Sequence, residues 1–316
     1  MTTHPQKLPR EIVAVWLLYL VDATVMLVTY TRLPARELYH VSGTGLTGGL
    51  SRVLSFSNFS TALVAIAILA LLADRTRSRV TIAVAVTGVI CCAAVVWPGV
   101  VDQADLDARS VNAIPGIGVL IALLLTALAL RDGTAWSPRR AGDRVRIVVA
   151  VVAVVFALPW IAAESGFFLN DAPLLGRVFQ TGRFVAGDPL PAVHHGHHHG
   201  LDGLLLLLTA LLLSRTVPAM RHTALRVAVG LYLALMAVYG VANSANDFWT
   251  EQVIKRGWTT WAIPNVILPK VSIAWSLIVL GAAVLYALAS SRTVKQPHEP
   301  PEGGGIKHGR SAKVSP

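Results

Sequence analysis

Eight apolar segments, separated from one another by polar turns and loops, dominate the pattern along this chain of 316 residues. They cover residues 11–30, 57–74, 79–97, 112–130, 146–165, 199–214, 224–242 and 271–290. Most are close to the ~20 residues that a helix needs to cross the hydrocarbon core of a bilayer. The pattern therefore predicts an all-α fold, a polytopic transmembrane helix bundle of about eight helices.

Composition agrees with a membrane protein. Hydrophobic residues make up 54% of the chain and charged residues only 14%, whereas soluble domains contain about 25% charged residues. We expect a multi-pass protein of the cell membrane whose main partner is the lipid bilayer. Residues 11–290 would form the transmembrane domain, between a cytoplasmic tail at 1–10 and a disordered cytoplasmic tail at 291–316.

Basic residues are distributed unevenly between the connecting segments. If the N-terminus is cytoplasmic, the inner segments hold 18 of the 27 lysines and arginines. The positive-inside rule therefore predicts that both termini are cytoplasmic. The net charge of +10 then comes from short arginine-rich turns that face anionic lipid, and no nucleic-acid partner is expected.

The most unusual segment is 191–213, where PAVHHGHHHGLDG runs directly into LLLLLTALLL. It contains five of the ten histidines. If residues 192–213 form one helix, an arc of about 100° contains three histidines and one aspartate. These residues are His195, His198, His199 and Asp202. On the same helix His197 points to the opposite side, and His194 lies just beyond the edge of the arc.

Imidazole and carboxylate groups are ligands for divalent transition metals such as zinc and iron. We therefore interpret His195, His198, His199 and Asp202 as a metal site at the outer mouth of a transmembrane helix. The alternative interpretation is a histidine-rich cap that only keeps the end of the helix in contact with water.

Three further acids lie where a carboxylate is costly without a partner. Glu164 ends the fifth apolar segment and Asp247 follows the seventh, both near the predicted outer boundary. Either is a candidate metal ligand or catalytic base. Asp22 lies inside the first apolar segment, so we predict an intramembrane acid that handles protons or cations.

Other motifs do not change this picture. Residues 194–198 read as H-x-x-H-H, which resembles one histidine box of membrane desaturases and hydroxylases, but the other two boxes of those families are not present. Residues 43–48 match G-x-G-x-x-G without a preceding strand, so a dinucleotide site is excluded. We expect instead an outer loop that re-enters the protein at Ser55, Asn58 and Ser60.

Two classes of function fit these residues. One is a metal-dependent enzyme at the outer leaflet that acts on a lipid-like or membrane-proximal substrate, with Glu164 or Asp247 as the base. The other is a transporter or sensor for a divalent metal, in which Asp22 continues the path inward. A membrane scaffold with incidental histidines is a third interpretation, and the sequence specifies neither substrate nor oligomeric state.

The predicted orientation can be tested by cysteine labelling. Single cysteines at Ser55, Asp107, Thr181 and Thr259 should react with a membrane-impermeant reagent in intact cells. A cysteine at Ser137 should react only after the membrane is opened, because the positive-inside rule places it in the cytoplasm. Labelling at Ser137 in intact cells would reverse the orientation.

Overall fold

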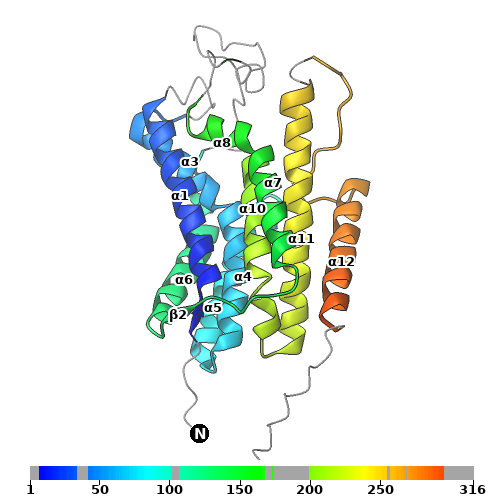
Figure 1. Ribbon diagram of the computed structural model, residues 1–316. Helices are drawn as coiled ribbons and strands as arrows, with labels where there is room; N and C mark the ends of the chain where they lie inside the picture. Colours follow the sequence, from blue (N-terminus) through cyan, green and yellow to red (C-terminus); the bar gives the residue numbers. More distant parts are fainter. Residues whose placement is uncertain are drawn as a thin grey trace, which may run out of the picture.

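The computed structural model describes residues 7–33, 42–101, 107–167, 173, 199–254, 257–267 and 269–294. Within these residues the protein is almost entirely helical (Figure 1). The helices of the first half are α1 (Arg10–Arg32), α3 (Gly45–Ser57), α4 (Ser60–Arg75), α5 (Arg79–Ala93) and α6 (Ala113–Leu130). Those of the second half are α7 (Asp143–Phe156), α8 (Leu158–Glu164), α10 (His199–Leu213), α11 (Thr223–Phe248) and α12 (Ile273–Val294).

Short elements complete the described chain. They are the strands β1 (Leu8–Pro9) and β2 (Thr134–Ala135), the 3₁₀ turns η1 (Ala94–Val96), η2 (Ser110–Asn112) and η3 (Val217–Ala219), and the π-helical turn η4 (Trp249–Ile254). The predicted tails at 1–10 and 291–316 are mostly outside the described residues, as are His194, His195, His197 and His198.

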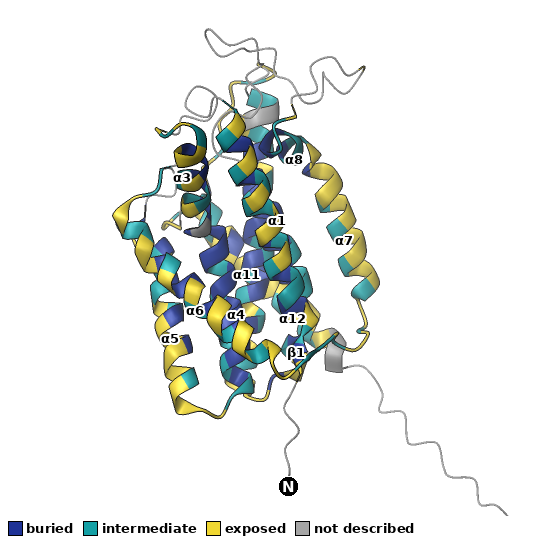
Figure 2. Cartoon of the chain, turned by 90° about the vertical axis from the view of Figure 1, so that its left-hand side faces the viewer, coloured by how far each residue is buried: buried dark blue, intermediate teal, exposed yellow. Residues whose placement is uncertain are grey.

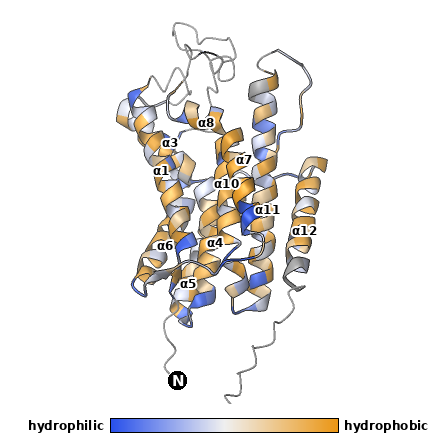
Figure 3. Cartoon of the chain, viewed as in Figure 1, coloured by the Kyte–Doolittle hydropathy of each residue, from blue (hydrophilic) through white to orange (hydrophobic). Residues whose placement is uncertain are grey.

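Among the described residues, six helices are long and apolar enough to cross a membrane singly, and two bent pairs, α3–α4 and α7–α8, raise the number to eight if each pair is one span. Hydrophobic positions extend along the helices (Figure 3). α1 begins and α12 ends at the same end of the bundle (Figure 1). The predicted all-α bundle is confirmed, while the cytoplasmic location of the termini stays a prediction. We call this end the inner end and the opposite one the outer end.

Each bend has a local cause. The bend of 45° between α3 and α4 falls at Phe59, whose φ of −126° and ψ of −85° are not helical. Asn58 caps α3 there by donating its side-chain amide to the carbonyl of Leu54. The bend of 57° between α7 and α8 precedes Pro159, which has no backbone N–H and disturbs the preceding helical turn.

The outer loop that we expected before Ser55 is wrong from residue 45 onward, because residues 45–57 form the helix α3. Leu46, Leu50 and Leu54 are exposed along one face of this helix, spaced as successive turns of an α-helix. Phe56 and Arg52 are buried. The Gly-rich start of the segment concealed this periodicity from the sequence analysis.

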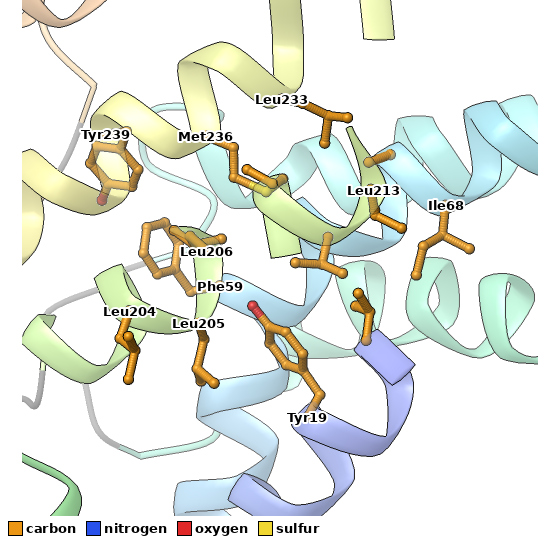
Figure 4. Packing of buried hydrophobic residues seen from close by; sticks show 14 of the residues in the cluster. Tyr19, Phe59, Ile68, Leu204, Leu205, Leu206, Leu213, Leu233, Met236 and Tyr239 are labelled. Carbon is orange, nitrogen blue, oxygen red and sulfur yellow. The ribbon is translucent and has the colours of Figure 1, made fainter. Parts of the chain in front are cut away.

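The core of the bundle lies between α1, α4, α10 and α11, where leucines, methionine and aromatic rings pack together (Figure 4). α10 and α11 share the most extensive contact. α7 is exposed along its length (Figure 2). Because its exposed residues are mostly valine and isoleucine, α7 is compatible with contact to lipid.

Two glycines allow α10 and α11 to approach closely. A Cβ atom on Gly203 would lie 2.4 Å from the carbonyl oxygen of Gly240, and one on Gly240 would lie 2.5 Å from the carbonyl oxygen of Gly203. Real Cβ atoms do not come so close to backbone oxygen. The spacing of these two helices therefore depends on glycine at both positions.

A network of charged groups fastens the inner end. The fully buried Glu11 accepts from Arg215 Nη1 at 2.9 Å and from the Ser137 amide at 3.0 Å. Arg215 Nε lies 3.3 Å from Asp143 Oδ1, and the Leu8 amide donates to the carbonyl of Gly133 at 2.8 Å. These bonds join the start of α1, the α6–α7 connection and the end of α10.

We predict that Gly203→Ala destabilises the protein by about 1–3 kcal/mol, because the added methyl group must separate α10 from α11. The thermal midpoint in detergent measures this loss. Gly116→Ala on α6 is the matched control, since a Cβ there meets nothing within 4 Å. Equal midpoints for both variants would contradict the close approach.

Candidate functional site

α10 begins at the outer end with His199, and Asp202 follows on the next turn. His199 Nδ1 and Asp202 Oδ2 are 4.0 Å apart, and both side chains are largely shielded from solvent. The predicted helix over 192–213 is therefore present from residue 199 onward. His195 and His198 lie outside the described residues, so their place on the same face stays a prediction.

Side chains of α11 hold the first turn of α10. Asp247 Oδ2 accepts from the Gly200 amide at 3.0 Å. Asn243 Nδ2 donates to the carbonyl of His199, and Ser244 Oγ to that of Gly200, each at 3.0 Å. Because the first amides of a helix have no partner within it, a carboxylate is a favourable acceptor at this point. Asp247 thus positions the helix that carries His199.

Asp202 is held from a third helix. Ser60, the first residue of α4, donates its hydroxyl to Asp202 Oδ1 at 2.7 Å. Ser60 is fully buried. The bend at Phe59 brings this hydroxyl to the outer half of the bundle, where it faces α10.

Glu164 is the last residue of α8 and is almost completely buried. One turn earlier on α8, the indole ring of Trp160 packs on Gly200, where an added Cβ would lie 2.1 Å from the ring. α8 therefore lies directly against the first turn of α10. This contact brings the predicted base Glu164 to the same region as His199.

Arg52 on α3 is a member of this region that the sequence analysis missed. Its side chain is buried, and its guanidinium carbon lies 5.6 Å from the centre of the Tyr30 ring. Its electrostatic partners are Tyr30, Glu164 and Asp202. The available signal was one arginine in the otherwise uncharged stretch LTGGLSRVLSF.

We call Arg52, Glu164, His199, Asp202 and Asp247 the outer polar cluster. It contains three carboxylates and one arginine, contributed by α3, α8, α10 and α11. In a low-dielectric interior, carboxylates in excess of nearby positive charge bind protons or cations. The cluster therefore contains more carboxylates than arginines.

The predicted intramembrane acid, Asp22, lies on α1 and is half-buried. Tyr19, one turn earlier and buried, is within electrostatic range of both Asp22 and Asp202.

Among the described residues, no three His, Cys, Asp or Glu side chains are grouped closely enough to hold a metal ion. His199 and Asp202 form a pair, and Asp247 is engaged with the Gly200 amide. The other two predicted ligands, His195 and His198, lie outside the described residues. The structure therefore describes two of the four predicted ligands, His199 and Asp202.

We predict that Arg52→Ala lowers stability by about 3–5 kcal/mol, because it leaves buried carboxylates without their positive neighbour. The loss should shrink at acidic pH, where protonated carboxyl groups no longer need that charge. Thermal midpoints across a pH series measure both effects. Arg32→Ala, at the exposed outer end of α1, is the control and should change stability by less than about 0.5 kcal/mol. A pH-independent loss would contradict the electrostatic role of Arg52.

Comparisons with protein-family models, with curated proteins and with solved structures find no match to this chain.

Proposed function

We propose that the protein binds a divalent transition metal, zinc or iron, at its outer face through His195, His198, His199 and Asp202. The observation that carries this proposal is the His199–Asp202 pair, shielded at the outer end of an otherwise apolar bundle. Two ligand atoms of a tetrahedral zinc ion lie about 3.3 Å apart, given metal–ligand distances near 2 Å. The separation of 4.0 Å needs only a small side-chain adjustment to reach that value.

The surrounding residues fit such a site. Ser60 and the α11 side chains fix the backbone and carboxylate of the first turn of α10, which is how supporting hydrogen bonds orient metal ligands. Arg52 offsets part of the negative charge of Glu164 and Asp202. The remaining excess of carboxylates favours a cation.

The function that we favour is an enzyme that acts on a lipid-like or membrane-proximal substrate. A bound divalent metal would supply a Lewis acid for polarising the substrate or for activating water. Glu164, buried beside the first turn of α10, is our candidate for the base that accepts a proton. Asp247 is the second candidate for the base, and its hydrogen bond to the Gly200 amide holds it beside the first turn of α10. The outer polar cluster lies at the outer end of helices whose exposed surfaces are compatible with lipid, which supports a substrate that resides in the membrane.

Metal content of the purified full-length protein tests the proposal. The unmodified protein should contain about one zinc or iron ion per chain, measured by elemental analysis after removal of free metal. His198→Ala and His199→Ala should lower this content sharply, since each removes a ligand. His197→Ala, on the opposite face of the predicted helix, is the matched control and should retain it, with His194→Ala in between. Equal losses for all five histidines would indicate an unstructured histidine-rich segment, and a metal-free unmodified protein would leave the histidines incidental.

A transporter or sensor for a divalent metal is the second candidate, favoured by Asp22, a half-buried acid inside the membrane-spanning helix α1. For a transporter, Asp22→Asn should reduce metal uptake into liposomes while the metal content at the outer site is unchanged. Asp132→Asn, an exposed acid at the inner end, is the control for loss of a carboxylate. Unchanged uptake in Asp22→Asn would exclude Asp22 from a metal path.

A further inference from the structure

Residues 257–267, with the sequence GWTTWAIPNVI, lie between α11 and α12 at the outer end of the bundle (Figure 1). We call them the tryptophan segment. It contains no charged residue and no histidine. Its two tryptophan side chains are strongly exposed, Trp258 at 72% and Trp261 at 68%. Two exposed indole rings on an uncharged segment form an apolar surface, and such surfaces mark sites of interaction.

Side chains at the outer end of α11 and in η4 fix the tryptophan segment through every third carbonyl. The three hydrogen bonds, at 2.8, 2.9 and 2.8 Å, run from Trp249 Nε1 to the Trp261 carbonyl, from Asn246 Nδ2 to that of Pro264 and from the Tyr239 hydroxyl to that of Ile267. Tyr239 and Trp249 are ten residues apart, so the bonds extend over about 15 Å along the helix axis. The segment is therefore held against α11 along its length.

Backbone amides of the tryptophan segment also have partners within it. The Trp261 amide donates to Thr259 Oγ1 at 3.1 Å, and the Ile267 amide donates to Asn265 Oδ1 at 2.8 Å. Pro264 has no amide hydrogen. In water an irregular segment does not need such internal bonds, whereas unsatisfied backbone groups are costly where water is scarce. This bonding pattern therefore favours a lipid environment around the segment.

The exposed apolar surface continues from the tryptophan segment into α12. Val271 precedes α12 and is fully exposed, and Ile273, Leu277 and Leu280 are exposed along one face of the helix. α12 is long and apolar enough to cross a membrane, so this face is compatible with contact to lipid. α11 extends farther outward than α12 (Figure 1). The tryptophan segment therefore lies at the level where α12 leaves the apolar part of the bilayer.

We propose that the tryptophan segment is a lipid-binding surface that rests in the ester and headgroup region of the leaflet at the outer end, with Trp258 and Trp261 as its anchors. In this region an indole ring contacts lipid carbon atoms while its N–H bonds to lipid oxygens. Asn246, which bonds the segment, directly precedes Asp247, which bonds the first turn of α10. Asp247 of the outer polar cluster therefore lies close to the same depth. The contact with lipid requires no metal and is independent of the proposed metal site.

Spin labelling measures the depth of the segment. Single cysteines carry the label at Thr260, at Leu280 on the exposed face of α12 and at Ala141 in the inner connection, all three exposed, with Cys91 and Cys92 replaced by alanine. The full-length protein, in phosphatidylcholine vesicles without added metal, meets oxygen, which concentrates in the bilayer, and a water-soluble nickel chelate. The ratio of oxygen to nickel collisions at Thr260 should differ by about twofold or more from both other sites and lie between them, because the interface separates hydrocarbon from water.

Three results would overturn the proposal. A ratio at Thr260 equal to that at Ala141 would place the tryptophan segment in water. A ratio equal to that at Leu280 would place it in the hydrocarbon. Few collisions with either reagent would mean that protein, such as a second copy of this chain, covers the segment.

Removing the indole rings tests their role as anchors. In the double variant Trp258→Ser, Trp261→Ser, the ratio at Thr260 should fall by about twofold or more, toward the value for water. The double variant Trp258→Tyr, Trp261→Tyr should keep the original ratio, since tyrosine also favours the interface. Trp136→Ser, an exposed tryptophan at the inner end, is the matched control and should leave the ratio unchanged. An unchanged ratio in the serine variant, or equal losses in the serine and tyrosine variants, would exclude the rings as anchors.

Discussion

The close approach of α10 and α11 is the constraint on which the outer end depends. Gly203 and Gly240 place the two backbones in contact, and only at that spacing can Asp247, Asn243 and Ser244 reach the first turn of α10. A larger residue at either glycine would move a whole helix. The position of His199 therefore depends on the two glycines, Gly203 and Gly240, as much as on the hydrogen bond that its own carbonyl accepts from Asn243.

The two ends of the bundle use charge differently. At the inner end, Glu11 has a direct arginine partner and a backbone amide, so its charge is compensated and contributes to holding three segments together. At the outer end, the buried Arg52 is the electrostatic partner of two carboxylates, Glu164 and Asp202. A buried acid with a direct basic partner holds the segments that carry the two residues together. In contrast, an excess of negative charge in a buried region favours binding of a positive charge.

Hydropathy predicted the bundle well because membrane thickness fixes the length of each apolar segment. It did not predict α3, because glycines interrupt the apolar positions of this helix in the sequence. The exposed apolar face of α3, which is compatible with lipid, was therefore assigned to a loop. Hydropathy also did not predict the two bends. They depend on the non-helical backbone of Phe59 and on Pro159, which disturbs the last turn of α7. For the candidate site, Glu164, Asp202 and Asp247 were placed near one level by topology alone. Arg52 was missed because its partners come from α8 and α10, far away in sequence. The roles of all these residues, and of His195 and His198, stay predictions.

The shorter helices of the two bent pairs, α3 and α8, carry opposite charges. Arg52 belongs to α3 and Glu164 to α8, and each shorter helix meets the longer helix of its pair at a bend rather than along a straight axis. A change in either bend angle would shift one charge relative to α10, and it would also move a core side chain, Phe56 of α3 or Trp160 of α8. The balance of charge around His199 and Asp202 is thus mechanically coupled to the packing of the bundle.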